Sequence, residues 1–143
     1  MYHENATVDA LMKRGYLYLE DHDWKNAKGY FDDSLDIDPE NAQAYIGMLL
    51  SELHIEHESE IVKADISFTD NYYYQKALKF AKDSYKQKIV GYNLDNIMYQ
   101  SEKLATNAKT EDEYYKQHNY LKVFPIIKTH LSVQQQCENK PLI

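Results

Sequence analysis

The sequence is poor in residues that cross-link a chain or interrupt its regular structure. Its 143 residues include four glycines and three prolines, which argues against a loop-rich β-sandwich or barrel. A single cysteine, Cys137, excludes an internal disulfide and fits a reducing compartment. These shortages favour a domain with short connections that is held together by its core.

Positive charge is also scarce, and so are long apolar runs. Sixteen Lys and Arg stand against 23 Asp and Glu, a net charge of −7, which disfavours nucleic-acid and anionic-lipid partners. No apolar run approaches membrane-spanning length. The first residues, MYHENATVD, lack the basic and apolar regions of a signal peptide. We therefore expect a soluble cytoplasmic protein, or a cytoplasmic piece of a longer one, with no membrane and no nucleic acid among its partners.

The chain does contain enough apolar residues to bury a core. Hydrophobic residues make up 43% of it, which is typical of a folded chain, and its length suits one domain. Fourteen residues are tyrosines. A tyrosine ring offers a large contact area with a polar tip, so these residues suit packed layers and recognition surfaces.

Apolar residues recur at three- and four-residue steps through most of the chain, as in amphipathic helices. Asp23 and either Asp70 or Asn71 have the short polar side chains of helix N-caps. Pro39 ends one helix and is well placed to open the next. The predicted helices span about 6–21, 23–38, 42–53, 71–87, 88–107, 111–123 and 127–138.

No useful run of alternating β periodicity is present, so the predicted fold class is all-α. Segment 54–71 is charged and weakly periodic, with room for one short turn around 60–64. Thr110 and Glu113 fit a capping box before the helix at 111–123.

The first helix pair carries a known repeat pattern. Gly15, Tyr18, Ala27, Phe31 and Pro39 have the spacing G-x2-Y, A-x3-F, P. The pattern resembles the tetratricopeptide repeat, a helix–turn–helix unit of about 34 residues. Two positions depart from it, since Leu11 stands for the family's Trp and Arg14 for its Leu.

The spacing has a physical explanation. Two antiparallel helices approach closely only where a side chain is small, and Gly15 and Ala27 supply such points. Phe31 and Tyr18 would then fill the volume beside the crossing, because protein interiors tolerate few voids.

The resemblance implies a right-handed superhelix of about three helical hairpins in a single domain, 1–143. Its parts are unit one at 8–41, unit two at 42–87 with an insertion at 54–71, a degenerate unit three at 88–123 and a capping helix at 127–138. In unit three, Gln117 and Leu121 stand where a small residue and an aromatic are expected. The chain is similar to a tetratricopeptide module of Gram-positive gut bacteria, which implies a bacterial helical-repeat domain but no activity.

Tetratricopeptide proteins bind peptides or proteins on a concave face built from the first helix of each pair. The predicted binding residues on that face are Met12, Tyr16, Leu19, Glu20, Gln43, Ile46 and Leu50. Asp9 and Leu53 extend the same face. The cap and the insertion could instead cover these residues as core. Met12 and Tyr16 stand where chaperone-binding relatives carry Lys and Asn, so a chaperone C-terminus is not expected as the ligand.

Several other side chains allow alternative functions. The insertion at 54–71 could hold a metal-binding or enzymatic site. His54, His57 and Glu58 could bind zinc there, although a solvated helix end is the commoner use of such residues. Tyr72 or Tyr73 is a candidate contact residue, whereas Tyr74 shares the core face.

Three further patterns each allow a functional and a structural interpretation. The acidic run Asp32, Asp33, Asp36, Asp38, Glu40 could attract a basic partner or simply face water. Cys137 and His130 are two helical turns apart, too far to act as a nucleophile and its base. Exposed tyrosine and leucine faces could also make the chain a homo-oligomer. The sequence therefore predicts a protein-binding scaffold and not an enzyme, with no cofactor and no bound metal.

Overall fold

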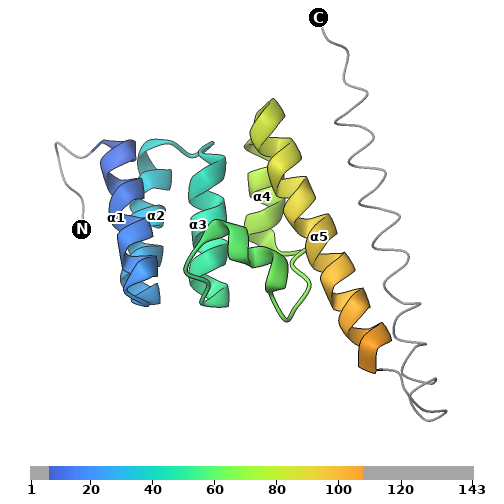
Figure 1. Ribbon diagram of the computed structural model, residues 1–143. Helices are drawn as coiled ribbons and strands as arrows, with labels where there is room; N and C mark the ends of the chain where they lie inside the picture. Colours follow the sequence, from blue (N-terminus) through green and yellow to red (C-terminus); the bar gives the residue numbers. More distant parts are fainter. Residues whose placement is uncertain (1–6, 108–143) are drawn as a thin grey trace, which may run out of the picture. The chain divides into compact units, whose positions relative to one another are not determined.

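The computed structural model describes residues 7–107, and every regular element in that range is a helix (Figure 1). This confirms the all-α fold class for the described part of the chain. In order, the elements are α1 (Val8–Glu20), α2 (Trp24–Ile37), α3 (Ala42–Leu53), the 3-10 helix η1 (Glu58–Lys63), α4 (Tyr72–Phe80) and α5 (Asp83–Asn107). The helices predicted at 111–123 and 127–138 lie outside the described residues.

The described residues group into two compact units. The first contains residues 7–61 and 70–82, and therefore α1 to α4; the second contains residues 62–69 and α5. Within the first unit, α1 contacts α2, α2 contacts α3 and α3 contacts α4, and α1 also contacts α3. The single domain at 1–143 and its repeat boundaries stay predictions.

Short polar side chains start the helices of the first unit. The carboxylate of Asp23 accepts from the backbone N–H of Asn26 at 3.2 Å, and Asn71 accepts from the N–H groups of Tyr73 and Tyr74 at 2.9 and 3.2 Å. These contacts confirm the predicted caps at Asp23 and Asn71, because each occupies N–H groups that the first helical turn leaves unpaired.

Three predicted helix boundaries were wrong. Pro39 does not open α3; Asn41 caps it instead, with its side-chain oxygen 3.1 Å from the N–H of Ala44. The helix predicted at 71–87 ends at Phe80, because Ala81 takes an extended backbone conformation (ψ 139°). α5 then begins at Asp83, five residues before the predicted start, with the Asp83 carboxylate in its first turn, where the helix dipole favours negative charge.

Phe31 lies at the centre of the first unit, where α1, α2 and α3 meet. A Cβ atom added to Gly15 of α1 would lie 2.5 Å from the Phe31 ring, and one added to Gly47 of α3 would lie 2.6 Å from it. Phe31 and Ala27 are both fully buried. The predicted close approach at Gly15 is therefore confirmed, Ala27 is buried, and Gly47 adds a second contact that the repeat pattern did not indicate.

Tyr18 does not fill the helix crossing as predicted. It is half-buried and stacks on Tyr30 of α2, with ring centroids 5.4 Å apart. Tyr16 lies against Phe31 instead, edge to face at 5.3 Å.

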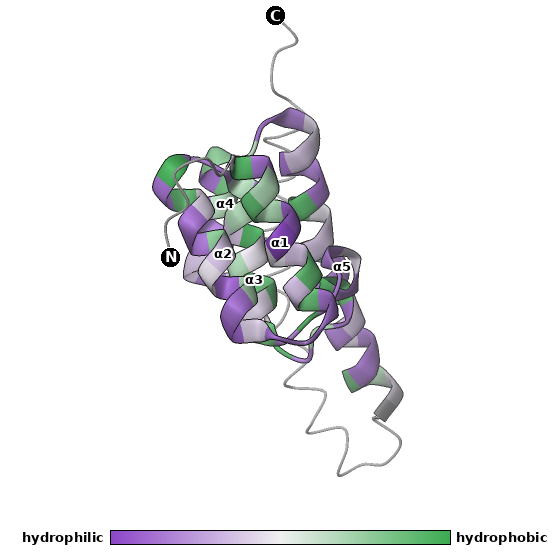
Figure 2. Cartoon of the chain, turned by 90° about the vertical axis from the view of Figure 1, so that its left-hand side faces the viewer, coloured by the Kyte–Doolittle hydropathy of each residue, from purple (hydrophilic) through white to green (hydrophobic). Residues whose placement is uncertain are grey.

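Hydrophilic and hydrophobic residues are interleaved along the helices, as in amphipathic helices (Figure 2).

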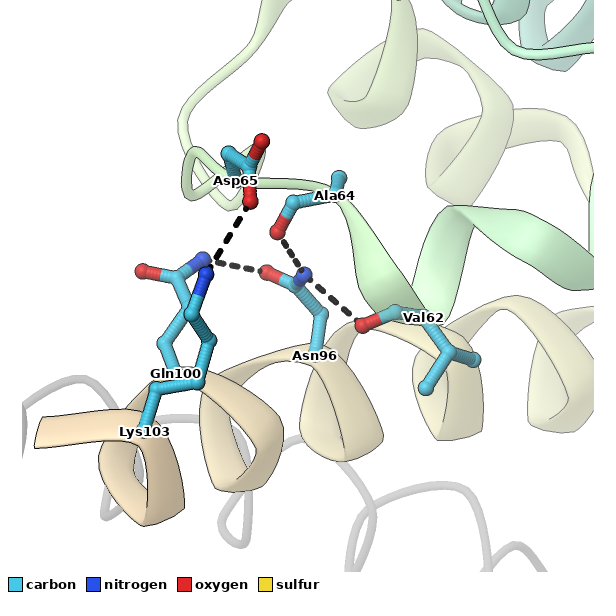
Figure 3. A network of polar contacts seen from close by, with 6 residues as sticks. All are labelled: Val62, Ala64, Asp65, Asn96, Gln100 and Lys103. Carbon is cyan, nitrogen blue, oxygen red and sulfur yellow. Dashed lines mark hydrogen bonds and ion pairs between the residues drawn. The ribbon is translucent and has the colours of Figure 1, made fainter. Parts of the chain in front are cut away.

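In the second unit, α5 holds segment 62–69 through amide side chains. Asn96 is fully buried, and its side-chain nitrogen donates to the carbonyl oxygens of Val62 at 3.0 Å and Ala64 at 2.9 Å (Figure 3). Gln100 donates to the Asn96 side-chain oxygen at 2.7 Å, which fixes the orientation of the amide. Asn96 therefore supplies hydrogen bonds that an irregular segment cannot supply for itself.

Candidate functional site

The predicted binding residues of α1 separate into buried and accessible side chains. Met12 and Leu19 are buried in the first unit, and Tyr16 is half-buried against Phe31. Glu20, at the end of the helix, is exposed, as is Asp9 at its start. Only part of the predicted face on α1 is therefore within reach of a partner in this conformation.

The predicted residues of α3 divide in the same way. Ile46 and Leu50 are buried, with exposed fractions of 1% and 0%, whereas Gln43 in the first turn is exposed and Leu53 in the last is half-buried. α1 and α3 contact each other within the first unit. The predicted assignment of these residues to a binding face stays a prediction.

A cation and two tyrosines gather where α1 and α2 lie side by side. The guanidinium carbon of Arg14 is 5.8 Å from the centre of the Tyr18 ring and 5.2 Å from that of Tyr30. Hydrogen bonding to Tyr18, and then to Tyr30, raises the pKa of Arg14. Such an arrangement holds three long side chains in one conformation at the surface, through stacking and cation–π attraction.

A second group of tyrosines and cations lies at the start of α4. Tyr72 is 63% exposed, and its ring meets that of Tyr73 edge to face at 5.4 Å. The ammonium of Lys76 lies 5.6 Å from the centre of the Tyr72 ring, and that of Lys28, on α2, lies 5.5 Å from Tyr73. Tyr74 is buried, as predicted, so the consecutive tyrosines divide between core and surface.

Tyr45 and Phe80 form a third aromatic contact, between α3 and α4. Their rings stack at 6.0 Å, and the Tyr45 hydroxyl donates to the carbonyl oxygen of Pro39 at 3.0 Å. Burial, followed by the nearby Tyr72, raises the pKa of the Tyr45 hydroxyl. This tyrosine therefore stays neutral and keeps its proton for Pro39.

The histidines considered for a metal have other contacts. The His54 ring stacks on Trp24 at 5.0 Å, and Nε2 of His57 lies 3.4 Å from the Glu56 carboxylate. Within residues 7–107, no group of three or more His, Cys, Asp and Glu side chains is arranged to hold a metal ion. Cys137, His130, Gln117 and Leu121, which were also considered from the sequence, lie outside the described residues.

The acidic run occupies the second half of α2 and the turn after it. Asp32, Asp36, Asp38 and Glu40 are exposed, and Asp33 is half-buried. Asp38 accepts from the N–H of Glu40 at 3.3 Å, so one of these carboxylates helps to order the turn.

Sequence reasoning found some of the surface tyrosines and missed their partners. The four-residue spacing of Arg14 and Tyr18 already places them on one helical face. The approach of Tyr30, and that of Lys28 to Tyr73, depends on how α2 packs against α1 and α4. That packing has no signature in the local sequence.

Two further findings concern the described helices and the comparison of the chain with known proteins. No helix between residues 7 and 107 is both long and apolar enough to cross a membrane. The chain matches no protein-family model, no curated protein and no solved structure.

Proposed function

We propose that this chain is a protein-binding scaffold, a tetratricopeptide-like module that holds a peptide or another protein on a preformed helical surface. It acts by binding and not by catalysis, in the cytoplasm of a bacterial cell. The supporting observation is that Glu20, Gln43 and part of Tyr16 stay accessible on helices already packed around Phe31.

The packing of the first unit supports the tetratricopeptide part of the proposal. In a stack of helical hairpins, the first helix of each pair contacts the first helix of the next, and α1 contacts α3 in addition to α2. The ring of Phe31 lies against Gly15, and Phe31 and Ala27 are fully buried, as the repeat pattern would require. In the proposed right-handed superhelix, α1–α2 and α3–α4 are the first two hairpins.

The chemistry of the surface supports a protein or peptide as the partner. Tyrosine and arginine are enriched among the residues that contribute most to binding at protein interfaces. A rigid helical surface also loses little conformational freedom when a partner binds, so less of the contact energy is spent on ordering. The proposed binding face consists of Glu20, Gln43 and the accessible edge of Tyr16. The other residues predicted for this face are buried in the core of the first unit: Met12, Leu19, Ile46 and Leu50.

A displayed peptide library tests this proposal directly. Peptides selected on the folded chain are measured by calorimetry against the wild type and against a Glu20→Ala, Gln43→Ala double variant. Removal of interface contacts worth about 1 kcal/mol should weaken binding about fivefold. Asp36→Ala, an exposed change on α2, serves as the matched control. Failure to select any peptide, or equal affinity for all three proteins, would contradict the proposed face.

Homo-oligomerisation is the second candidate function. Leu17 of α1 and Ile37 of α2 are large apolar side chains with exposed fractions of 55% and 40%. If these side chains make a dimer, light scattering should give a mass that rises with protein concentration. A Leu17→Ser variant should then remain a monomer. A wild-type mass of one chain across the concentration range would rule this candidate out.

A further inference from the structure

Two helices of the first unit end on a histidine in an unusual backbone conformation. His22 follows α1 with φ 58°, His54 follows α3 with φ 57°, and within residues 7–107 no other non-glycine residue has a positive φ. The turns are alike, because the N–H of Asp23 bonds the Tyr18 carbonyl at 2.9 Å and that of Ile55 bonds the Leu50 carbonyl at 2.9 Å. Such helix ends normally carry glycine or asparagine, so the imidazoles need another explanation.

Both imidazoles stack on the same indole. The His22 ring lies 5.2 Å from that of Trp24 at an interplanar angle of 15°, and the His54 ring lies 5.0 Å from it at 7°. The stack joins the turn between α1 and α2 to the end of α3, segments about thirty residues apart in sequence.

A carboxylate completes the cluster. One oxygen of Glu56 lies 3.0 Å from Nε2 of His22, and the other lies 3.4 Å from Nε2 of His57. Residues 54–57 are therefore joined to the α1–α2 turn in two ways. The His54 ring stacks on Trp24, and the Glu56 carboxylate makes a polar contact with His22.

We propose that His22, Trp24, His54, Glu56 and His57 form a proton-responsive clasp, which fastens residues 54–61 to the α1–α2 turn. Histidine is the side chain that ordinarily changes charge between about pH 5 and 8. When the imidazoles of His22 and His57 gain protons, their contacts with Glu56 become charge-assisted. An imidazolium over the indole is also attracted to the ring face. The clasp is therefore tighter at mildly acidic pH than at pH 8.

Stronger acid reverses this effect. The hydrogen bond from His22 lowers the pKa of Glu56, so the carboxylate persists below the usual carboxyl range. Its contribution is complete above that range and is lost as the pH falls through the lowered pKa. His22 and His57 then face a neutral Glu56, and the attraction that held them to it is lost. The other charged residues near the cluster are Glu20, Asp21, Asp23 and Lys25 at the α1–α2 turn, and Glu52, Glu58 and Glu60 next to or within residues 54–61.

Asp23 and Glu52 contact asparagine residues and not the imidazoles. Asp23 accepts from the backbone and side-chain nitrogens of Asn26 at 3.2 and 2.7 Å, and Glu52 accepts from the side chain of Asn71 at 3.4 Å. Glu56 is thus the carboxylate that the structure places in contact with both His22 and His57.

Tryptophan fluorescence tests the stack, because Trp24 is the single tryptophan of the chain. A protonated imidazole in contact with an indole quenches its emission, so the emission of the folded protein should fall in one step between pH 8 and pH 5. A His22→Asn, His54→Asn variant keeps side chains that tolerate the left-handed conformation and should lose the step. A flat wild-type titration, or an unchanged step in the variant, would show that the stack does not respond to protons.

Hydrogen exchange tests the fastening of residues 54–61. Relative to intrinsic exchange rates, their amides should exchange about two- to fivefold more slowly at pH 5.5 than at pH 8. Glu56→Gln keeps the size of the side chain but removes its charge and should abolish this difference. Glu60→Gln, an exposed change in the same segment, should preserve it. Protection that is equal at both pH values in the wild type, or equal in Glu56→Gln and wild type, would overturn the proposal.

Discussion

At the residue scale, the packing of the first unit depends on the absence of two side chains. The ring of Phe31 occupies the space that a Cβ atom would take at Gly15 and at Gly47, on two different helices. Because Phe31 is fully buried, it has no solvent-facing direction in which to move. Glycine is needed at these positions for close approach and not for backbone freedom.

We predict that Gly15→Ala and Gly47→Ala each destabilise the protein. The added methyl overlaps the Phe31 ring, and overpacking of this kind costs about 1–3 kcal/mol. That exceeds the gain of about 0.5–1 kcal/mol expected when alanine replaces glycine in a helix. Urea unfolding followed by circular dichroism measures the difference.

Gly29→Ala and Gly91→Ala are the matched controls. A Cβ atom at either position meets nothing within 4 Å, so these changes should be neutral or should stabilise by about 0.5–1 kcal/mol. If all four variants lose stability alike, the overlap with Phe31 is not the cause.

Exposure is the property of single residues that the sequence predicted least well. Helical periodicity correctly grouped Met12, Tyr16 and Leu19 on one face of α1, but it could not show which of them a neighbouring helix would cover. Ile46 and Leu50 illustrate the same point on α3, where seven of twelve residues are buried. Burial depends on what packs against a face, and periodicity carries no information about that.

At the scale of whole elements, polar side chains decide where the helices begin and how the irregular segment is held. The caps at Asp23 and Asn71 followed from local sequence because each bonds an N–H two or three residues away. The break between α4 and α5 did not follow, since the sequence there contains neither glycine nor proline.

Asn96 provides a prediction about segment 62–69. Asn96→Ala removes the donor for the carbonyls of Val62 and Ala64, and an unsatisfied buried polar group costs about 1–3 kcal/mol. We expect a loss of that size in urea unfolding. Asp95→Ala, an exposed change at the next residue, should alter stability by less than about 0.5 kcal/mol. An equal loss in both variants would show that the hydrogen bonds from the Asn96 side chain do not contribute to the free energy of unfolding.

The helix dipole gives a second prediction at this scale. Asp9 lies in the first turn of α1, where negative charge is favourable, whereas Asp36 lies in the last turn of α2, where it is unfavourable. Thermal unfolding at low salt should therefore show that Asp9→Asn loses, and Asp36→Asn gains, about 0.3–1 kcal/mol. Shifts of the same sign in both variants would contradict this explanation.

At the scale of the whole molecule, the dominant property is the excess of negative charge. A net charge of −7 produces self-repulsion that disfavours the compact state and is screened by salt. The screening length falls from about 30 Å to about 8 Å between 0.01 and 0.15 M ionic strength.

We predict that the melting temperature at pH 7.5 rises over this range of sodium chloride concentration. The same titration near pH 5.3, the sequence isoelectric point, should give a much smaller rise because the net charge is then close to zero. Differential scanning fluorimetry measures both series. A melting temperature that falls with salt at pH 7.5 would show that specific ion pairs outweigh the general repulsion.

Local sequence was enough to predict the all-α class of the described part, the positions of α1, α2 and α3, the cap of α2 at Asp23 and the close approach at Gly15. Each of these depends on residues within a few turns of one another, whose spacing is visible along the chain. Three other features became visible only in the tertiary structure. They are the packing of Phe31 against Gly47, the hydrogen bonds from Asn96 to Val62 and Ala64, and the stacking of His22 and His54 on Trp24. Apart from the stack of His22 on Trp24, which lies within one turn, these contacts join residues about 16 to 34 positions apart. A local pattern does not indicate which distant residue will pack against it.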